Sequence, residues 1–309
     1  MKTLITGAAG FIGSHVVERL VAVGDDVRCL VRPTTDRRWI QNAPLEFFVG
    51  DLADESDLER ATADVDCVIH LAGITKTRDP AAYYAVNGDG TARLADACLK
   101  RTTPPLFIYV SSQAAAGPCS SGAGLSEDDA CRPVSEYGRS KLAGEHALAS
   151  RGRELPFIIL RPSAIYGPRD NELLLFFKFI AAGVEPAIGW EDRYLNLCYV
   201  ADLVDAITAA PKSPSAVGRT YFVAHDAVVS WRDVSRSAAA ALGVKTRRVT
   251  VPKAVVFGAA LVAELAATLR GEAATLNREK VKELTQDRWV CDISRARRDL
   301  GFSPRVDLD

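Results

Sequence analysis

A glycine-rich turn close to the N-terminus limits the folds open to this chain more than any other feature. It spans residues 7–13 and separates a short apolar run, residues 3–6, from residues 11–23, where apolar side chains recur at helical spacing. Such a run is typical of a buried parallel strand, and the glycines permit a tight turn into a helix. The turn departs by one residue from the G-x-G-x-x-G pattern, but a helix that starts this way can direct its free backbone N–H groups at a pyrophosphate. The turn therefore predicts a dinucleotide-binding site.

The alternation of strand and helix that begins at this turn continues through the first half of the chain. Alternating elements of this kind predict an α/β fold with a Rossmann-type, doubly wound parallel sheet. We assign residues 1–169, which include the helix that carries Tyr137 and Lys141, to a dinucleotide-binding domain. The expected strands are residues 26–31, 45–49, 65–71, 106–110 and 157–160, and the expected helices are residues 54–63 and 84–101.

Helical periodicity dominates after residue 170. This region, residues 170–309, is predicted to be smaller, mostly helical and mainly substrate-binding, and the sequence leaves open whether it returns elements to the sheet. Helices are expected at residues 171–182, 201–210, 231–242 and 252–269, with short strands near Tyr221 and Arg248.

Composition and charge argue against several classes of function. The chain has 309 residues and a formal net charge of −1, so it has no basic excess for a phosphate backbone, and nucleic acid is not an expected partner. Its seven cysteines are scattered without a C-x-x-C pair, which argues against a disulfide framework and against a metal site. The N-terminus shows no secretory leader, and the apolar stretch at residues 254–269 is too short to span a bilayer comfortably. We therefore predict a cytoplasmic protein with no membrane span.

Residues at the ends of the predicted strands indicate the kind of dinucleotide. NAD-binding chains carry a carboxylate after the second strand for the adenosine ribose, whereas this chain has Val31 and then Arg32. A guanidinium offers a planar fork of donors to a 2′-phosphate, so Arg32, with Arg37 and Arg38 able to assist, favours NADP. NAD remains the alternative, because Arg32 is also compatible with a solvated loop. Further strand ends, where ligands collect in such sheets, carry Asp51, Leu52, Leu71, Ala72 and Gly73.

Asp51 allows a second interpretation, because it also suits the N-cap of the helix that follows it. Ser111 and Ser112 directly follow the strand at residues 106–110, and either hydroxyl could reach the active site. A long segment leads from there to Tyr137, and long loops at strand ends usually serve as lids or binding loops, so we expect it to contact substrate.

Tyr137 and Lys141 are four residues apart, so on a helix their side chains lie on the same face. A free phenol titrates near about pH 10, but an adjacent cation stabilises the phenolate and lowers its pKa toward the working range. Tyr137 could then act as an acid or a base at neutral pH.

Together these motifs resemble the extended short-chain dehydrogenase/reductase superfamily, which includes the NAD(P)-dependent epimerases and dehydratases. The resemblance covers nearly the whole chain. It rests on residues 7–13, Asp51 and Leu52, residues 70–73, Asn87, Ser111 and Ser112, Tyr137 with Lys141, residues 160–162, residues 199–203, residues 292–296 and residues 300–304.

The resemblance implies that Ser112, Tyr137 and Lys141 are catalytic. Ser112 would hydrogen-bond the substrate oxygen, Tyr137 would transfer the proton, and Lys141 would lower the pKa of Tyr137 and hold the nicotinamide ribose. Ser111 would be structural, and Asn87 would fix the helix of the lysine through a water or a main-chain contact. The implied cofactor contacts are Gly7, Gly10, Gly13 and the backbone of Phe11 and Ile12 at the pyrophosphate, Pro162 and Ile165 at the nicotinamide, and Arg32, Asp51, Leu52, Leu71, Ala72, Gly73, Asn87, Tyr137 and Lys141 around the rest of the dinucleotide.

Residues 30–33 and the Ala- and Leu-rich C-terminal helices are more similar to the dihydroflavonol-reductase and 3β-hydroxysteroid-dehydrogenase-like branch than to the nucleotide-sugar epimerases. This favours reduction of a small-molecule ketone or aldehyde by NADPH, in a protein that the resemblance implies is a homodimer. Arg193 could match the diphosphate-binding arginine of the epimerases, which keeps an NAD-dependent epimerase or dehydratase as the alternative. A cofactor-sensing protein without catalysis is the alternative of another class. Side chains that could line an apolar substrate pocket are Val255, Val256, Phe257, Leu261 and Leu265.

Overall fold

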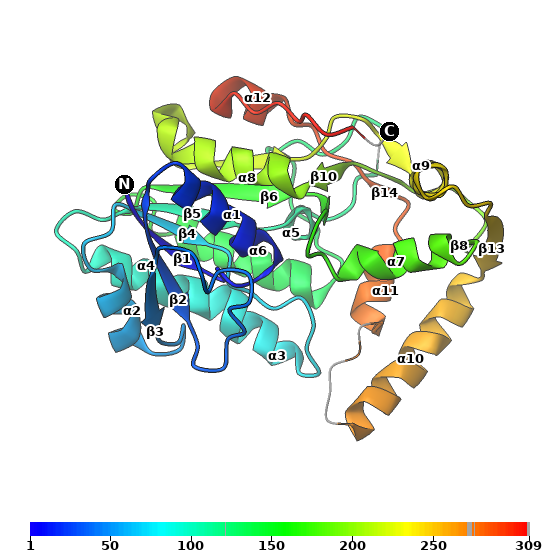
Figure 1. Ribbon diagram of the computed structural model, residues 1–309, viewed down its shortest axis with the longest axis horizontal. Helices are drawn as coiled ribbons and strands as arrows, with labels where there is room; N and C mark the ends of the chain where they lie inside the picture. The colour runs from blue at the N-terminus through cyan, green and yellow to red at the C-terminus, as the bar shows by residue number, and fades with distance from the viewer. Residues whose placement is uncertain (121, 271–273, 275, 308–309) are drawn as a thin grey trace.

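A seven-stranded parallel sheet forms the centre of the molecule (Figure 1). The computed structural model describes residues 1–120, 122–270, 274 and 276–307. The strands follow the order β3-β2-β1-β4-β5-β6-β11, and every neighbouring pair is parallel. The order reverses between β1 and β4, which is the point where ligands bind in doubly wound sheets. The strands are β1 (Lys2–Thr6), β2 (Asp26–Val31), β3 (Glu46–Val49), β4 (Cys67–His70), β5 (Leu106–Val110), β6 (Phe157–Pro162) and β11 (Arg219–Val223).

Helices cover both faces of this sheet and enclose two apolar cores. Successive strand residues face opposite sides, so in β1 the buried Leu4 belongs to one core and the buried Ile5 to the other. This arrangement confirms the predicted α/β, Rossmann-type fold. The Ile5 side is covered by α1 (Phe11–Ala22) and α8 (Val200–Ala209), and the Leu4 side by α2 (Glu55–Thr62), α4 (Gly90–Leu99) and α6 (Glu136–Ala149).

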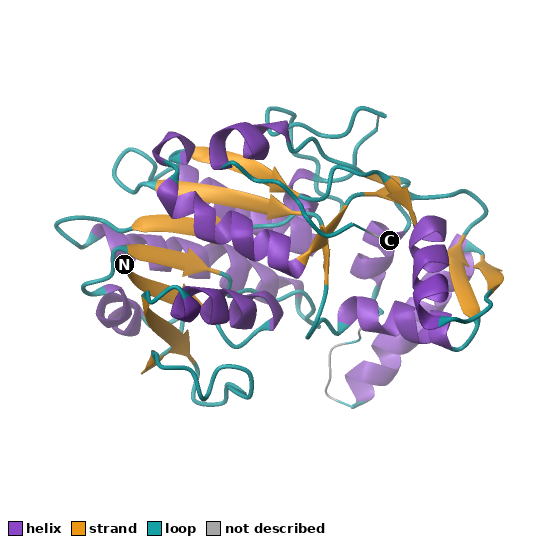
Figure 2. Ribbon diagram, turned by 45° about the horizontal axis from the view of Figure 1, so that its top comes forward, coloured by secondary structure: helices purple, strands orange, loops and turns teal. Residues whose placement is uncertain are grey.

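The second half of the chain adds β11 to the main sheet, where Tyr221 lies opposite Leu160 in β6. The rest of this half forms three small sheets and several helices, most of them beyond the ends of the main strands (Figure 2). The small sheets pair β7 (Ala164–Tyr166) with β10 (Leu197–Tyr199), β8 (Val184–Ile188) with β13 (Arg247–Val251), and β9 (Tyr194–Leu195) with both β12 (Val229–Ser230) and β14 (Arg288–Trp289). The helices are α7 (Glu172–Ala181), α9 (Trp231–Leu242), α10 (Lys253–Leu269), α11 (Arg278–Leu284) and α12 (Ser294–Leu300).

Two local predictions differ from the structure. The helix expected at residues 84–101 consists of α3 (Pro80–Tyr83), a π-helix, η1 (Tyr84–Asp89), and α4. The segment expected as one long loop before Tyr137 contains α5 (Gln113–Ala116). Part of that segment is also attached to the C-terminal region, because the N–H of Leu125 donates to the carbonyl of Val290 at 2.9 Å. Backbone hydrogen bonds therefore hold this loop at Cys119, Leu125 and Arg132.

The cysteines and His70 are explained by their local surroundings. All seven cysteines are free thiols, and all except Cys131 are buried. The imidazole of His70 is buried and hydrogen-bonds Thr6 at 2.6 Å and Thr91 at 3.0 Å. Across the described residues, no group of three His, Cys, Asp or Glu side chains is suited to a metal ion, and no helix combines the length and apolar character needed to cross a bilayer.

Candidate active site

The glycine turn brings the start of α1 against the ends of β1 and β4. Gly7 has a φ of 73°, a left-handed conformation that favours glycine. A Cβ on Gly7 would lie 2.6 Å from the backbone N of Ala72, and a Cβ on Gly13 would lie 2.1 Å from the carbonyl oxygen of Gly7. A larger residue at either position would push the helix away from the two strands. Both glycines are therefore required by the close packing of the turn.

The N-terminal end of α1 presents backbone donors at the switch point of the sheet. Gly10 is exposed at the N-cap, and no side chain caps this helix. The N–H groups of Phe11 and Ile12 lie in the first turn of the helix, where an intrahelical acceptor is lacking. An exposed, uncapped helix start of this kind fits the pyrophosphate of a nicotinamide dinucleotide. These residues would hold that group through their backbone.

The segment after β2 presents one arginine toward solvent. The backbone N–H of Arg32 donates to the Thr35 hydroxyl at 3.0 Å, while the Arg32 side chain is exposed and forms no ion pair with any described residue. Arg37 instead lies over the Phe47 ring at 4.9 Å, and Arg38 pairs with Asp36. Of the three arginines named from the sequence, Arg32 is thus the one whose guanidinium remains available to a ligand.

Asp51 follows β3 as expected, but it does not cap α2. The cap is Asp54, whose carboxylate accepts backbone N–H groups of the first helical turn at 2.9 and 3.1 Å. Asp51 accepts the N–H of Ala53 at 2.9 Å, and its side chain is exposed beside the half-buried Leu52. The sequence interpretation of Asp51 as a cap is wrong because the chain makes one more turn before the helix begins.

The end of β4 lies against both the glycine turn and η1. The N–H of Ala72, which follows Leu71, donates to the Thr6 hydroxyl at 3.2 Å. A Cβ on Gly73 would lie 2.9 Å from Oδ1 of Asn87. These residues therefore join the ends of β1 and β4 to the helices that carry the polar site.

Close packing between α5 and α6 brings Ser112 and Tyr137 together. A Cβ on Gly138 would lie 2.3 Å from the carbonyl oxygen of Ala114, so only glycine lets the two helices approach this closely. Ser112 is the N-cap of α5, and its side chain lies close enough to the phenol of Tyr137, in the first turn of α6, to lower the pKa of that phenol. The Tyr83 ring lies 6.2 Å from the Tyr137 ring in an edge-on arrangement. The structure thus places two hydroxyl groups near each other at the carboxyl end of β5.

The two neighbouring serines point to different surroundings. Ser112 accepts the N–H of Ala114 at 3.1 Å, within the site. Ser111 is buried, and its hydroxyl donates to Glu145 at 2.5 Å, beneath α6. Glu145 in turn forms a buried ion pair with Arg161. The expectation that Ser111 is structural is confirmed.

Lys141 is buried at the end of β5, which its four-residue spacing from Tyr137 did not predict. Its ammonium donates to the carbonyl of Val110 at 2.8 Å and lies 4.2 Å from the centre of the Tyr109 ring. Burial lowers the pKa of Lys141 to about 7. The spacing correctly predicted one helix face, but it did not predict that a backbone carbonyl would hold the ammonium.

The pKa of Tyr137 shifts in the direction opposite to the sequence expectation. Burial raises it, and the negative charge of Glu283 raises it further, while the hydrogen bond with Ser112 opposes both. The main causes of the shift are burial and the charges around the phenol, and Lys141 is not one of them. The phenol of Tyr137 is therefore held in its protonated form.

Asn87 connects the site through its side chain. Its Nδ2 donates to the Ser140 hydroxyl at 2.9 Å and to the carbonyl of Ile74 at 3.1 Å, and its Oδ1 accepts the N–H of Ile74 at 2.9 Å. The residue lies in the π-helix η1, a wide turn that is frequent at functional sites. Asn87 therefore fixes α6 next to Lys141 as predicted, but through Ser140 and not through a water or a main-chain group.

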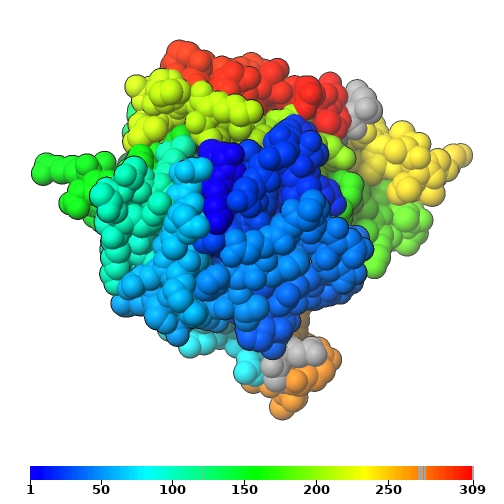
Figure 3. Space-filling model, turned by 60° about the vertical axis from the view of Figure 1, so that its left-hand side comes forward, coloured from blue at the N-terminus to red at the C-terminus, as the bar shows by residue number. Residues whose placement is uncertain are grey.

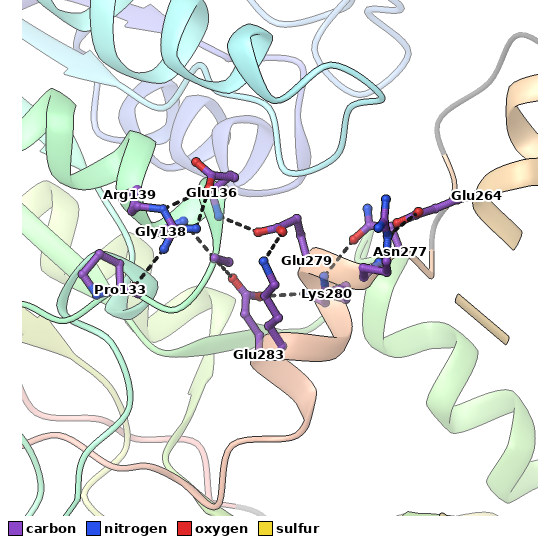
Figure 4. A network of polar contacts seen from close by, with 12 residues as sticks. Pro133, Glu136, Gly138, Arg139, Glu264, Asn277, Glu279, Lys280 and Glu283 are labelled. Atoms are coloured by element: carbon purple, nitrogen blue, oxygen red, sulfur yellow. Dashed lines mark hydrogen bonds and ion pairs between the residues drawn. The ribbon is translucent and has the colours of Figure 1, made fainter. Parts of the chain in front are cut away.

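α11 covers the N-terminus of α6 with charged side chains that the sequence analysis missed. Figure 4 shows Glu279 of α11 directed at Glu136, with Lys280 and Glu283 of the same helix nearby. Glu283 accepts the hydroxyl of Ser135 at 2.6 Å, and Glu279 accepts the N–H of Glu136 at 2.7 Å. α11 is thereby held over the first turn of α6, which is the turn that carries Tyr137.

Lys280 joins α11 to α7. Its ammonium donates to Glu172 at 3.1 Å and lies 3.8 Å from Glu283. Both carboxylates raise the pKa of Tyr137, so the cluster acts on the site electrostatically. Residues 278–284 have the composition of a solvated surface helix, so nothing in this stretch of sequence indicated that it lies beside Tyr137.

Two features lie on the side of the site away from α1. Pro162 ends β6 and Ile165 lies in β7, at the position predicted for the nicotinamide. A cavity of about 120 Å³ follows immediately, and its walls are mainly apolar. Residues that line it are Tyr166, Leu173, Phe177, Leu197, Trp231 and Val234.

Arg193 is buried in the loop before β9. One of its terminal nitrogens donates to the carbonyl of Ile188, while Nε and the other terminal nitrogen have no partner among the described residues. Burial lowers the pKa of this guanidinium. Unpaired buried donors of this kind suit an anion.

The sequence matches a known family over most of its length. The model of the NAD dependent epimerase/dehydratase family matches residues 3–224. The chain belongs to this family. The match includes the glycine turn, both serines, Tyr137 and Lys141, and it ends at the residue after β11.

Relatives within the family include both reductases and epimerases. A ceramide reductase of Caulobacter vibrioides is 31% identical over 289 residues, which cover 93% of this chain and 84% of that protein. A decarboxylating sterol-4-alpha-carboxylate 3-dehydrogenase of Saccharomyces cerevisiae is 26% identical and covers 100% of this chain and 95% of that protein. The UDP-glucuronic acid 4-epimerase of Bacillus cereus in complex with NAD has a TM-score of 0.79 at 25% identity, and the alignment covers 100% of this chain and 95% of that one.

Membership of the NAD dependent epimerase/dehydratase family confirms the class of enzyme predicted from the sequence. The chain is an NAD(P)-dependent enzyme of the type that comprises oxidoreductases and epimerases. The exposed donors of α1, the glycines beside them and the hydroxyl pair at the end of β5 lie along one edge of the sheet, where such a cofactor binds in this fold.

Proposed function

We propose that this protein is an NADPH-dependent reductase of a ketone or aldehyde, with Ser112, Tyr137 and Lys141 as its catalytic residues. The observation that carries the proposal is the position of the Ser112 hydroxyl beside the Tyr137 phenol at the carboxyl end of β5, where close packing at Gly138 brings α5 and α6 together. Two hydroxyl groups placed this way can bind one carbonyl oxygen together, and the dinucleotide site of α1 shares the same sheet edge.

In the reduction that we propose, Tyr137 is the proton donor. A reduced nicotinamide, when bound, would supply the hydride to the carbonyl carbon. Ser112 donates a hydrogen bond to the carbonyl oxygen and stabilises the negative charge that develops there. Tyr137 donates its proton to the same oxygen, which completes the alcohol. Because burial and Glu283 raise the pKa of Tyr137, the phenol is protonated in the resting protein and suited to act as an acid.

Lys141 and Asn87 would position this machinery. The ammonium of Lys141 would hold the nicotinamide ribose, and Asn87 keeps α6 in place through Ser140. The pKa of about 7 for Lys141 reflects burial in the protein alone. A hydroxyl-bearing ligand beside the ammonium would stabilise its charged form.

The choice of NADPH rests on Arg32. Its exposed guanidinium follows β2, where a carboxylate would receive an NAD ribose and would repel a 2′-phosphate. A planar fork of donors can bind that phosphate in two places at once. The remaining cofactor contacts predicted from the sequence belong to the same proposal, as does the division into a cofactor-binding part up to residue 169 and a mainly substrate-binding part after it.

The substrate class that we propose is an apolar or amphipathic ketone. The cavity after β7 has apolar walls, and it begins at Tyr166, the residue after the predicted nicotinamide contact Ile165. The relatives named above include a ceramide reductase and a sterol dehydrogenase, whose names describe apolar substrates. Of the pocket residues predicted from the sequence, Val256 packs against Ala260 and Val281, so it supports α10 from within.

The proposal is tested by cofactor binding together with one variant. We expect purified protein to bind NADPH more tightly than NADH, and to consume NADPH with a long-chain N-acylated 3-ketone. Tyr137→Phe should keep cofactor binding and lose turnover by a factor of about 10²–10⁴. Tyr84→Phe is the matched control, because it removes only a phenol that donates to Glu136 on the surface of the same region. Equal affinity for the two cofactors would contradict the role of Arg32, and unchanged turnover in Tyr137→Phe would contradict the catalytic assignment.

Arg193 favours a second candidate function. Its unpaired buried donors suit the diphosphate of a nucleotide sugar, and the epimerase of Bacillus cereus is similar over the whole of this chain. An enzyme of that kind would retain NAD and interconvert UDP-sugars without net oxidation. Incubation with UDP-glucuronic acid, followed by separation of the 4-epimers, would decide for this candidate if both epimers appear and no free NADH is released. The cytoplasmic location and the homodimer implied by the resemblance stay predictions.

A further inference from the structure

The outer side of α10 is an apolar surface that no described residue covers. Figure 1 shows the helix running away from the main sheet, and in Figure 3 the orange segment that contains it protrudes below the body of the molecule. Six large apolar side chains are between 37% and 90% exposed. They are Val255, Phe257, Leu261, Val262, Leu265 and Leu269.

This surface extends most of the way around the helix. The packed side is narrow, because Val256 and Ala260 contact Val281 of α11 and leave the other directions open. At 100° per residue, the exposed positions cover an arc of about 200°, and Thr268 is the single polar side chain on it. A helix that packs against one partner needs an apolar stripe of about 100°. One helix of a second copy would therefore cover only half of the arc.

The ends of the helix carry groups that favour a lipid interface. Lys253 opens α10 and Arg270 follows it, so a basic residue lies at each end, and the ammonium of Lys253 is 3.7 Å from a carboxylate oxygen of Asp287. Trp190 is 77% exposed and belongs to the loop that contacts the start of α10, since a Cβ on Gly189 would lie 3.7 Å from Cε of Lys253. Tryptophan and lysine at the end of an apolar segment are typical anchors at the boundary between lipid and water.

The acid of this helix does not oppose such contact. Glu264 lies on the packed side, where it accepts the backbone N–H of Arg278 at 2.7 Å and its guanidinium at 2.8 Å. Its charge is thus compensated by α11. The exposed arc itself carries no charged residue between Lys253 and Arg270.

We propose that α10 is a bilayer-docking helix, which lies in the plane of the lipid interface with its exposed arc among the acyl chains. A helix of 17 residues is about 25 Å long, and no helix among the described residues is long and apolar enough to cross a bilayer, so α10 would lie on the membrane. The docking requires neither cofactor nor substrate and is independent of the proposed reductase activity. It would place the site beside a source of apolar substrates.

The test measures binding of the full chain, without cofactor, to vesicles of phosphatidylcholine and to vesicles of phosphatidylcholine with phosphatidylglycerol. We expect wild-type protein to sediment with vesicles, and its emission to shift to shorter wavelength through a component that Trp190→Phe removes. Val262→Glu should weaken vesicle binding by about tenfold or more, because it introduces a charge into the lipid-facing arc. Val23→Glu is the matched control, since Val23 is 63% exposed and Val262 is 66% exposed, but Val23 lies at the far end of α1.

Two results would overturn the proposal. The first is equal sedimentation of wild type and Val262→Glu with vesicles. The second is a wild-type oligomer, detected by sedimentation velocity, that Val262→Glu dissociates while neither protein binds vesicles, because α10 would then be a contact between copies. Retained binding of NADPH by Val262→Glu confirms that the variant is folded. A loss of NADPH turnover alone would bear on the proposed function and not on docking.

Discussion

Two charge clusters contact α6, and they differ in how far solvent reaches them. Between the middle of the helix and the sheet, Glu145 and Arg161 form an ion pair whose side chains are 4% and 6% exposed. At the N-terminus of the helix, Lys280 and Glu172 form a pair whose side chains are 40% and 51% exposed, with Glu283 beside it. The first pair is closed by packing and the second is open.

This difference separates a cluster that supports the fold from one that acts on the proposed catalytic site. Removing one partner of a closed pair leaves a buried charge without compensation, whereas an open pair can exchange its partner for water or a ligand. The closed pair binds Ser111, and the open cluster acts on the phenol of Tyr137. Neighbouring polar residues on one helix can therefore serve stability or chemistry, depending on which cluster they join.

Breaking each cluster separately should lower the stability of the protein by different amounts. Glu145→Gln should lower the free energy of unfolding by about 3–5 kcal/mol, because the guanidinium of Arg161 stays buried without its carboxylate. Lys280→Gln should lower it by no more than about 1 kcal/mol, since that pair is half-exposed. Urea unfolding of both variants checks the difference. Similar losses in the two variants would show that the clusters do not differ as described.

Ser111 and Ser112 allow the same comparison, because they are adjacent in sequence but only Ser111 contacts the closed pair. Ser112→Ala should reduce kcat by about 10²–10³, because a donor to the developing oxyanion is lost. Ser111→Ala should leave kcat nearly unchanged and lower the free energy of unfolding by about 1.5–3 kcal/mol, the contribution of a hydrogen bond to a charged group. Turnover and unfolding are measured on both proteins. A large kcat effect in Ser111→Ala would assign the catalytic hydroxyl to the other serine.

Lys141 belongs to the proposed catalytic site but is buried like the Glu145–Arg161 pair. Burial of its charge should therefore lower the stability of the folded protein. Its pKa is lowered to about 7, so between about pH 7 and about pH 10.5 the unfolded chain binds a proton that the folded chain does not. The free energy of unfolding of wild type should therefore rise as the pH increases across this window. Below the window Lys141 is charged in the folded protein, so the full cost of burying its ammonium is present there.

Lys141→Met removes that cost. We expect it to raise the free energy of unfolding by about 1–3 kcal/mol near pH 6, to flatten the rise with pH, and to abolish turnover. Urea unfolding near pH 6 and near pH 9 measures this. A variant that is less stable than wild type near pH 6 would mean that the hydrogen bond to Val110 outweighs the burial of the charge.

The parts of the site that could be predicted are those determined by local spacing. The glycine turn is read from residues 7–13 alone, and the helix that carries Tyr137 and Lys141 follows from their separation. The strand ends could be ordered because parallel strands and helices alternate regularly. The NAD dependent epimerase/dehydratase family and the fold were predicted correctly from these patterns.

The parts that could not be predicted depend on contacts between distant segments. Ser135 and Glu283 are separated by 148 residues, and the charged composition of residues 278–284 is equally typical of a helix in solvent. Likewise, the four-residue spacing gave the face of Lys141 but not its rotamer, which the carbonyl of Val110 determines. The spacing of residues along the sequence does not show that a distant charge such as Glu283 lies beside Tyr137. The pKa of Tyr137 was therefore predicted in the wrong direction.

The smallest expected effect is a shift in the pH profile of Glu283→Gln, and it tests the open cluster of Lys280, Glu172 and Glu283 most directly. Burial is the main cause of the raised pKa of Tyr137, and Glu283 is the next. Glu283→Gln removes a negative charge that disfavours the phenolate, so the pKa of Tyr137 should fall and the limb of the pH profile of kcat/KM that reports it should move to lower pH. Glu279→Gln is the matched control, because Glu279 lies on the same helix but is not one of the main causes of the raised pKa of Tyr137. An equal shift in both variants, or a shift to higher pH in Glu283→Gln, would show that α11 acts on the site by position and not through the charge of Glu283.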